Sequence, residues 1–155
     1  MHLRSLYLTH FKNYQQLEIE FSPKVNCFAG SNGVGKTNVL DAIYYLSMCK
    51  SYLNPVDNQN INYNEEFSVL QGHFERQTRN ETIYCSIHRS KKKRIKRNKK
   101  DYQKLSEHIG LLPVVMISPV DSNLISGGSE ERRKYIDRVI SQYDKDYLDK
   151  LIRYN

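Results

Sequence analysis

Residues 30–37 decide the fold; they read Gly30-Ser31-Asn32-Gly33-Val34-Gly35-Lys36-Thr37. The stretch matches the P-loop pattern GxxxxGK[ST], in which glycines let backbone N–H groups turn toward phosphates and a helix N-terminus adds a favourable dipole. The lysine of this pattern neutralises the β- and γ-phosphates, and the hydroxyl residue ligates Mg²⁺. Lys36 and Thr37 therefore predict a nucleoside triphosphate site, with ATP as the expected nucleotide and Mg²⁺ bound through Thr37.

The flanks of this loop predict an α/β fold. The apolar residues 25–29 before it favour a strand, and the segment 38–48 after it carries Val39, Ile43 and Leu46 at helical spacing. Further upstream, residues 3–9 favour a strand and residues 16–21 alternate polar and apolar. The short turn at residues 11–14 would join these two strands into a hairpin.

Downstream of the loop, the pattern predicts an antiparallel β subdomain and then helix. Residues 54–66 are polar and read as a surface loop, whereas residues 67–74 and 82–88 favour an antiparallel pair of strands. The basic run that follows favours a third strand with a turn at Asn98 and Lys99, and residues 111–118 favour a buried strand. Residues 129–154 predict one long helix with Ser129 as its N-cap.

Two units are expected from this order of elements. Residues 1–120 would form a nucleotide-binding lobe with the P-loop and the β subdomain, and residues 121–155 would begin a helical second lobe. The helical periodicity is still running at the last residue, without a C-cap glycine or proline, so we expect the chain to be cut from a longer protein.

Positive charge is concentrated in one segment. The chain has a net charge of +7, and residues 89–100 hold nine of its 24 basic residues without an acidic one. The other 15 basic residues are outnumbered by 17 acidic residues. A basic run of this kind is either a solvated hairpin or a surface for DNA or another polyanion. The candidate nucleic-acid residues are Arg89, Lys91, Lys92, Lys93, Arg94, Lys96, Arg97, Lys99 and Lys100.

The composition excludes several classes. No apolar run approaches the roughly 20 residues that a membrane span needs, and the N-terminus lacks the apolar core of a secretory signal. The expected compartment is therefore the cytoplasm. Three cysteines at wide spacing and five scattered histidines do not form a zinc pattern.

Two motifs far apart in the chain point to one family. Residues 6–14 end in Phe11-Lys12-Asn13-Tyr14, which resembles the opening turn of SMC-like ATPases. Residues 112–137 resemble the RecF signature, in which Gly-Gly-Pro is followed by two arginines, an aromatic residue, an aliphatic residue and Asp; Arg132, Arg133 and Asp137 fall at the family spacing. Ser129 stands where the family usually has Pro, and Val120 takes the usual acidic position.

The resemblance to the RecF family implies a P-loop NTPase fold with an ABC-ATPase-like head lobe. It implies an ATPase that dimerises around ATP on DNA, hydrolyses ATP slowly, and serves recombinational repair and SOS processing at replication gaps with RecO and RecR as partners. The Walker B strand and the signature motif match no segment here, so the chain alone is expected to be inactive. The predicted nucleotide-contacting residues are Gly30, Ser31, Asn32, Gly33, Val34, Gly35, Lys36, Thr37 and Asn38, together with Lys12 and Asn13.

Other interpretations remain open at this point. A different P-loop enzyme, such as a small-molecule kinase, would need its own catalytic carboxylate and lid arginines. An SMC-like head with a mainly structural role is a second alternative. Arg132 and Arg133 either contact DNA or hold their helix against the ATPase lobe.

Overall fold

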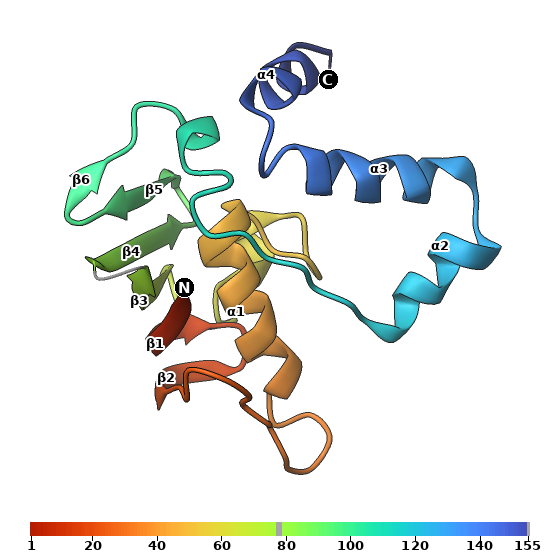
Figure 1. The fold of residues 1–155 in the computed structure, drawn as a ribbon. Coiled ribbons are helices and arrows are strands. Elements are labelled where there is room, and N and C mark those ends of the chain that lie inside the picture. The colour runs from red at the N-terminus through yellow and green to blue at the C-terminus, as the bar shows by residue number, and fades with distance from the viewer. Residues whose placement is uncertain (77–78, 155) are drawn as a thin grey trace.

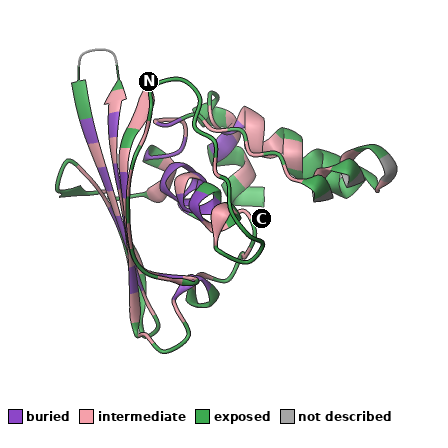
Figure 2. Cartoon of the chain, turned by 90° about the horizontal axis from the view of Figure 1, so that it is seen from below, coloured by how far each residue is buried: buried purple, intermediate pink, exposed green. Residues whose placement is uncertain are grey.

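The protein is described as a computed structural model that covers residues 1–76 and 79–154, without the side chains of residues 120, 123 and 126. A six-stranded antiparallel sheet with the order β2-β1-β3-β4-β5-β6 forms one layer, and the helices lie on one side of it (Figures 1 and 2). The strands are β1 (His2–Phe11), β2 (Tyr14–Glu20), β3 (Phe67–Arg76), β4 (Arg79–His88), β5 (Lys91–Arg97) and β6 (Lys100–Asp101).

The helices follow the sheet in two groups. The P-loop helix is α1 (Lys36–Met48), and the C-terminal part of the chain contains α2 (Asn123–Ser126), α3 (Ser129–Ile140) and α4 (Lys145–Tyr154). Short 3-10 turns are η1 (Asp57–Asn60), η2 (Leu105–Glu107) and η3 (Pro119–Ser122). No helix of the described residues is long and apolar enough to cross a membrane.

The core lies between the sheet and α1. Alternation along the strands sends Leu6, Leu70 and Ile83 to the inner face, where each is fully buried against Tyr45 and Leu46 of α1 and their neighbours. The approach is close: a Cβ added to Gly72 of β3 would lie 2.8 Å from the Leu46 side chain. Burial of this apolar face fixes α1, and with it the P-loop, against the sheet.

The predicted hairpins are confirmed. Strand β1 pairs with β2, β3 with β4, and β4 with β5, all antiparallel. The turn after β5 has Asn98 at φ 49° and Lys99 at φ 70°, the left-handed conformation that a two-residue hairpin turn needs. The polar segment 54–66 is a loop that contains η1, as expected.

The strand predicted at residues 25–29 is wrong. These residues have no regular structure, and Val25 is 84% exposed. The Asn26 side chain closes a local loop instead: it accepts the Ser22 N–H at 2.7 Å and donates to the Ser22 carbonyl at 2.9 Å. A strand is held by a neighbouring strand, and no described strand pairs with this segment.

The strand predicted at residues 111–118 is wrong for the same reason. A side chain takes the place of a neighbouring strand, because Gln142 accepts the Val114 N–H at 2.8 Å and donates to the Val114 carbonyl at 3.1 Å. Because no sheet covers the apolar side chains of this segment, Val115 and Ile117 are 66% and 79% exposed.

The single long helix predicted over residues 129–154 is two helices. The chain turns after α3, and Asp144 starts α4 as an N-cap whose carboxylate accepts the Tyr147 N–H at 2.9 Å. Ser129 is the first helical residue of α3 rather than its cap, because Gly128 takes the capping position. The buried apolar residue of α4 is Leu148.

Candidate nucleotide site

The P-loop has the backbone that a phosphate-binding loop requires. Gly30, Gly33 and Gly35 lie at φ 147°, 85° and 104°, a region that residues with a side chain rarely adopt. Helix α1 starts directly after Gly35, and neither a capping side chain nor an acidic residue occupies its first turn. Its N-terminus therefore keeps the positive end of the helix dipole for an anion.

Lys36 brings a full positive charge to the same place. Its ammonium group donates to the carbonyl oxygens of Gly30 and Ser31, both at 2.7 Å, so the side chain folds back across the loop. Thr37 follows on the first turn of α1 and is exposed. The loop thus combines backbone donors, a helix terminus and an ammonium group, the three elements that stabilise a polyphosphate.

The tip of the β1–β2 hairpin supports the loop. The Asn13 amide donates to the Val34 carbonyl at 3.1 Å, and Asn38 of α1 donates to the Asn13 side-chain oxygen at 2.7 Å. A Cβ at Gly35 would lie 2.6 Å from the Tyr14 hydroxyl, so packing as well as backbone conformation requires glycine there. The structure brings Asn13 to the P-loop; contact between Asn13 and a nucleotide stays a prediction.

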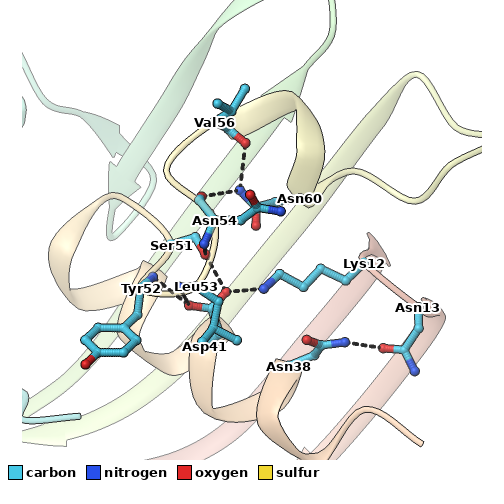
Figure 3. Close-up of polar contacts among 10 residues, drawn as sticks. All are labelled: Lys12, Asn13, Asn38, Asp41, Ser51, Tyr52, Leu53, Asn54, Val56 and Asn60. Carbon is cyan, nitrogen blue, oxygen red and sulfur yellow. Dashed lines mark hydrogen bonds and ion pairs between the residues drawn. The ribbon is translucent and has the colours of Figure 1, made fainter. Parts of the chain in front are cut away.

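The Lys12 side chain, unlike that of Asn13, forms an ion pair with a residue of α1. Its ammonium group lies 2.5 Å from the carboxylate of Asp41, a fully buried residue of α1 (Figure 3). Asp41 also accepts the Ser51 hydroxyl at 2.6 Å and the Tyr52 N–H at 2.7 Å. Lys12 therefore neutralises a buried carboxylate and ties the hairpin tip to α1, and any contact between Lys12 and a nucleotide stays a prediction.

Asp41 is the polar residue that sequence reasoning missed. Because unpaired buried carboxylates are costly, a charged residue within the apolar helical pattern of residues 38–48 signals a buried partner. The signal was present next to Val39 and Ala42, but the pattern alone does not name Lys12 as the partner.

Three residues of the basic run are occupied by contacts within the chain. Arg89 donates to the carbonyl of Glu65 at 2.8 Å, and Lys93 lies 3.0 Å from Asp57. Arg97 forms a two-pronged bond to Glu81, at 2.9 and 2.5 Å. These side chains stabilise the fold, and their availability to nucleic acid is reduced accordingly.

The rest of the run faces solvent. Arg94 and Lys96 lie 3.0 and 3.8 Å from the exposed Asp101, a pairing that solvent weakens. The other four residues have no ion-pair partner among residues 1–76 and 79–154. They are Lys91, Lys92, Lys99 and Lys100.

Residues 112–137, the second family-like motif, also form hydrogen bonds within the chain. Arg132 donates to the Gly127 carbonyl at 2.9 Å, next to the C-terminal end of α2, and Arg133 to the Ser129 hydroxyl at 3.4 Å. Asp121 accepts hydrogen bonds from Tyr52 and Ser118. Although burial acts to raise the pKa of Asp121, these hydrogen bonds hold it below its ordinary value. Within the described part of the chain, no group of three or more metal-ligating side chains gathers there or elsewhere.

A P-loop that leads into a helix packed on a sheet defines the class of P-loop NTPases. Comparison with known proteins shows to which family of this class the chain belongs. The family described as RecF/RecN/SMC N terminal domain matches residues 2–131. A curated relative, the DNA replication and repair protein RecF of Phocaeicola vulgatus, is 58% identical over the whole chain, and that of Flavobacterium johnsoniae is 53% identical over 99% of it. The chain spans 42% and 43% of these relatives.

Solved structures agree with this result. The structure described as the recombination mediator protein RecF with ATPrS in the RecFOR pathway has a TM-score of 0.93 at 31% identity, over 99% of this chain and 42% of that one. An Smc head bound to a winged-helix domain of ScpA has a TM-score of 0.68 at 24% identity, over 99% of this chain and 55% of that one, and shows the fold alone. The chain belongs to the RecF/RecN/SMC N-terminal domain family, which confirms the resemblance predicted from the two motifs.

Proposed function

We propose that the chain is the ATP-binding part of a RecF-type protein. The observation that carries the proposal is the Lys36 ammonium group, held by two loop carbonyls at the start of an uncapped helix. In this proposal the P-loop amides and Lys36 hold the phosphates, and Thr37 ligates Mg²⁺. A RecF relative has been solved with ATP, at 31% identity and a TM-score of 0.92, which supports the choice of nucleotide.

The proposed site is half of an ATPase centre. The described residues contain no apolar strand that ends in paired carboxylates, which a Walker B motif would provide. In the longer relatives' architecture, the Walker B and signature motifs would lie outside this chain, and dimerisation of the full-length protein around ATP would complete the site. An SMC ATPase described by its ATP-driven dimerisation shares the fold, with a TM-score of 0.69 at 20% identity. The division at residue 120 into this lobe and a second helical lobe is part of the same proposal.

DNA is the proposed macromolecular partner, with recombinational repair as its role and RecO and RecR as further partners. The names of the relatives support repair, and the solvent-facing part of the basic run supports contact with a polyanion. The relatives are bacterial, and bacterial DNA lies in the cytoplasm, the compartment we propose.

The test is calorimetric titration of ATP with Mg²⁺ into the chain and two variants. Lys36→Ala should weaken ATP binding by at least about tenfold, because charge-assisted contacts to phosphate are lost while the core is untouched. Lys24→Ala removes an exposed lysine outside the site and should leave the affinity unchanged.

Equal affinity for ATP in a folded Lys36→Ala variant would contradict the nucleotide site. ATP turnover by the chain alone, abolished by Lys36→Ala, would contradict the half-site and favour another P-loop enzyme.

A further inference from the structure

A cleft lies at the far end of α1 from the P-loop. It opens between the C-terminal part of α1 with the following turn and the pair α3 and α4, and its volume is about 690 Å³. Since α1 has 13 residues, the cleft is roughly 20 Å from the P-loop. A ligand there would be separate from the nucleotide.

One part of the cleft is apolar. Tyr44 and Met48 of α1 are buried on one side, and Leu148 of α4 is buried on the other. Ile152, one turn further along α4, lines the same cleft and is 56% exposed. An exposed isoleucine beside a buried apolar floor offers a place for an apolar side chain from outside.

Three cationic side chains line the same cleft; Lys134 is paired with Glu130 at 2.5 Å, and the other two are Lys50 and Arg138. Lys50 follows α1, and the Arg138 guanidinium of α3 lies 5.3 Å from the centre of the Tyr52 ring. Neither Lys50 nor Arg138 forms an ion pair with a carboxylate among the described residues. Lys50 is exposed at the rim of the cleft, but desolvation by its surroundings lowers its pKa, and the positive charges of Arg138 and Lys93 lower it further. An anion in the cleft would relieve this repulsion.

The nearby carboxylates already have neutral donors. Asp137 lines the cleft and accepts the Tyr147 hydroxyl at 2.5 Å, and Asp121, close to Arg138, accepts Tyr52 and Ser118. These carboxylates are already hydrogen-bonded and leave Lys50 and Arg138 without a direct ion pair.

A buried hydroxyl supplies a separate observation. Ser141 lines the cleft and is only 3% exposed, yet its Oγ has no hydrogen-bond partner in the part of the chain that the structure describes. A buried polar atom without a partner is costly unless a ligand or water satisfies it. The Ser141 hydroxyl can therefore donate a hydrogen bond to an oxygen atom of a ligand in the cleft.

We propose that this cleft binds an acidic peptide segment of a partner protein, with a bulky apolar side chain next to its carboxylates. The carboxylates meet Lys50 and Arg138, a peptide oxygen accepts the Ser141 hydroxyl, and the apolar side chain lies against Leu148 and Ile152. The volume is that of a ligand pocket rather than of a single ion site. The apolar wall favours a peptide over inorganic phosphate, which would use only the cations.

The experiment is fluorescence anisotropy with a labelled peptide of four aspartates followed by phenylalanine and leucine. Lys50→Gln and Arg138→Gln should each weaken binding by about five- to tenfold, the range expected for loss of one charge-assisted contact. Ile152→Glu should weaken it at least as much. The matched control is Lys150→Gln, which removes an exposed lysine of α4 that does not line the cleft.

Further arms separate the alternatives. A peptide with lysines in place of the aspartates and one with alanines in place of the apolar pair should both fail to bind, and saturating ATP should not displace the acidic peptide. Equal affinity in Lys50→Gln and Lys150→Gln would overturn the proposal. Displacement by millimolar inorganic phosphate, with no effect of Ile152→Glu, would overturn it in favour of a simple anion site.

Discussion

The two faces of the sheet differ in what their side chains do. On the inner face, Leu70 of β3 and Ile95 of β5 are buried in the hydrophobic core. On the outer face, the neighbouring residues Gln71 and Lys96 are only partly buried. No helix of the described chain covers this face of the sheet (Figure 2). A step of one residue along a strand thus moves a side chain from the core to an open surface.

The same alternation divides the basic run. Arg97 faces inward with Ile95 and is bonded to Glu81, whereas Arg94 and Lys96 pair in register with Ser86 and Tyr84 of the outer face. The nine basic side chains of residues 89–100 are therefore not all available to a polyanion. The face on which each side chain lies decides whether it stabilises the fold or is open to a ligand.

The largest expected effect tests the inner face. Leu70→Ala should lower the free energy of unfolding by about 3 kcal/mol, because it leaves a cavity in a fully buried site. Gln71→Ala, one residue along β3, should change it by no more than about 0.5 kcal/mol, as is usual for surface substitutions. Urea unfolding of both variants measures the difference. Equal losses would contradict the division into a core face and an open face.

Much of this architecture could be predicted from sequence. The alternating segments of β1 and β2 and of β3 and β4 carry both the period and the turn signals of hairpins, and Asn98 marks a two-residue turn. The P-loop is predictable because each of its roles requires a particular residue type. These features are local, so a short window of sequence contains the information.

The wrong or missed predictions concern segments whose structure depends on contacts with other parts of the chain. Residues 25–29 and 111–118 have the composition of strands, but no described strand pairs with either segment. The Asn26 side chain closes a loop to the Ser22 backbone, and the Gln142 side chain bonds the Val114 backbone. Asp144 breaks the long helix as an N-cap, a signal that the running apolar period concealed. The pairing of Lys12 with Asp41 joins residues 29 positions apart, a separation that no local pattern encodes.

A smaller effect tests the outer face. Replacing Lys92, Arg94 and Lys96 with Gln should weaken DNA binding about tenfold or more at low salt, because three phosphate contacts are removed. The slope of log affinity against log salt should fall in magnitude by about 2 to 3, at about 0.9 per duplex phosphate contact. Filter binding of one duplex between 50 and 200 mM salt measures both.

The control has the same change in charge. Lys24, Lys104 and Lys150 are exposed lysines outside the run, and their triple replacement with Gln should leave the salt slope nearly unchanged. If the two triple variants behave alike, the basic strand is only a solvated surface. The DNA surface would then have to be sought around Arg132 and Arg133.

The smallest effect concerns the inward pair of Glu81 and Arg97. The Arg97 guanidinium holds the pKa of Glu81 below its ordinary value, with help from the Asn98 amide and against the opposing effect of burial. A carboxyl whose pKa is lower in the folded state stabilises the fold above its unfolded pKa of about 4.3, and this stabilisation is lost as pH falls through the folded pKa. Because the Arg97 side chain is 40% exposed, the contribution at neutral pH should stay below about 1 kcal/mol.

Glu81→Gln keeps the shape of the side chain and removes its titration. The variant should therefore unfold at a lower urea concentration than the parent at pH 7, and the two midpoints should converge as pH falls from about 5 to 3. Glu130→Gln is the matched control, because Glu130 lies 2.5 Å from Lys134 but is fully exposed on α3; it should shift the midpoint less at every pH. A constant difference between Glu81→Gln and the parent from pH 7 to 3 would mean that the substitution disturbs packing at the end of β4, and that the charge of Glu81 contributes nothing to the inner face.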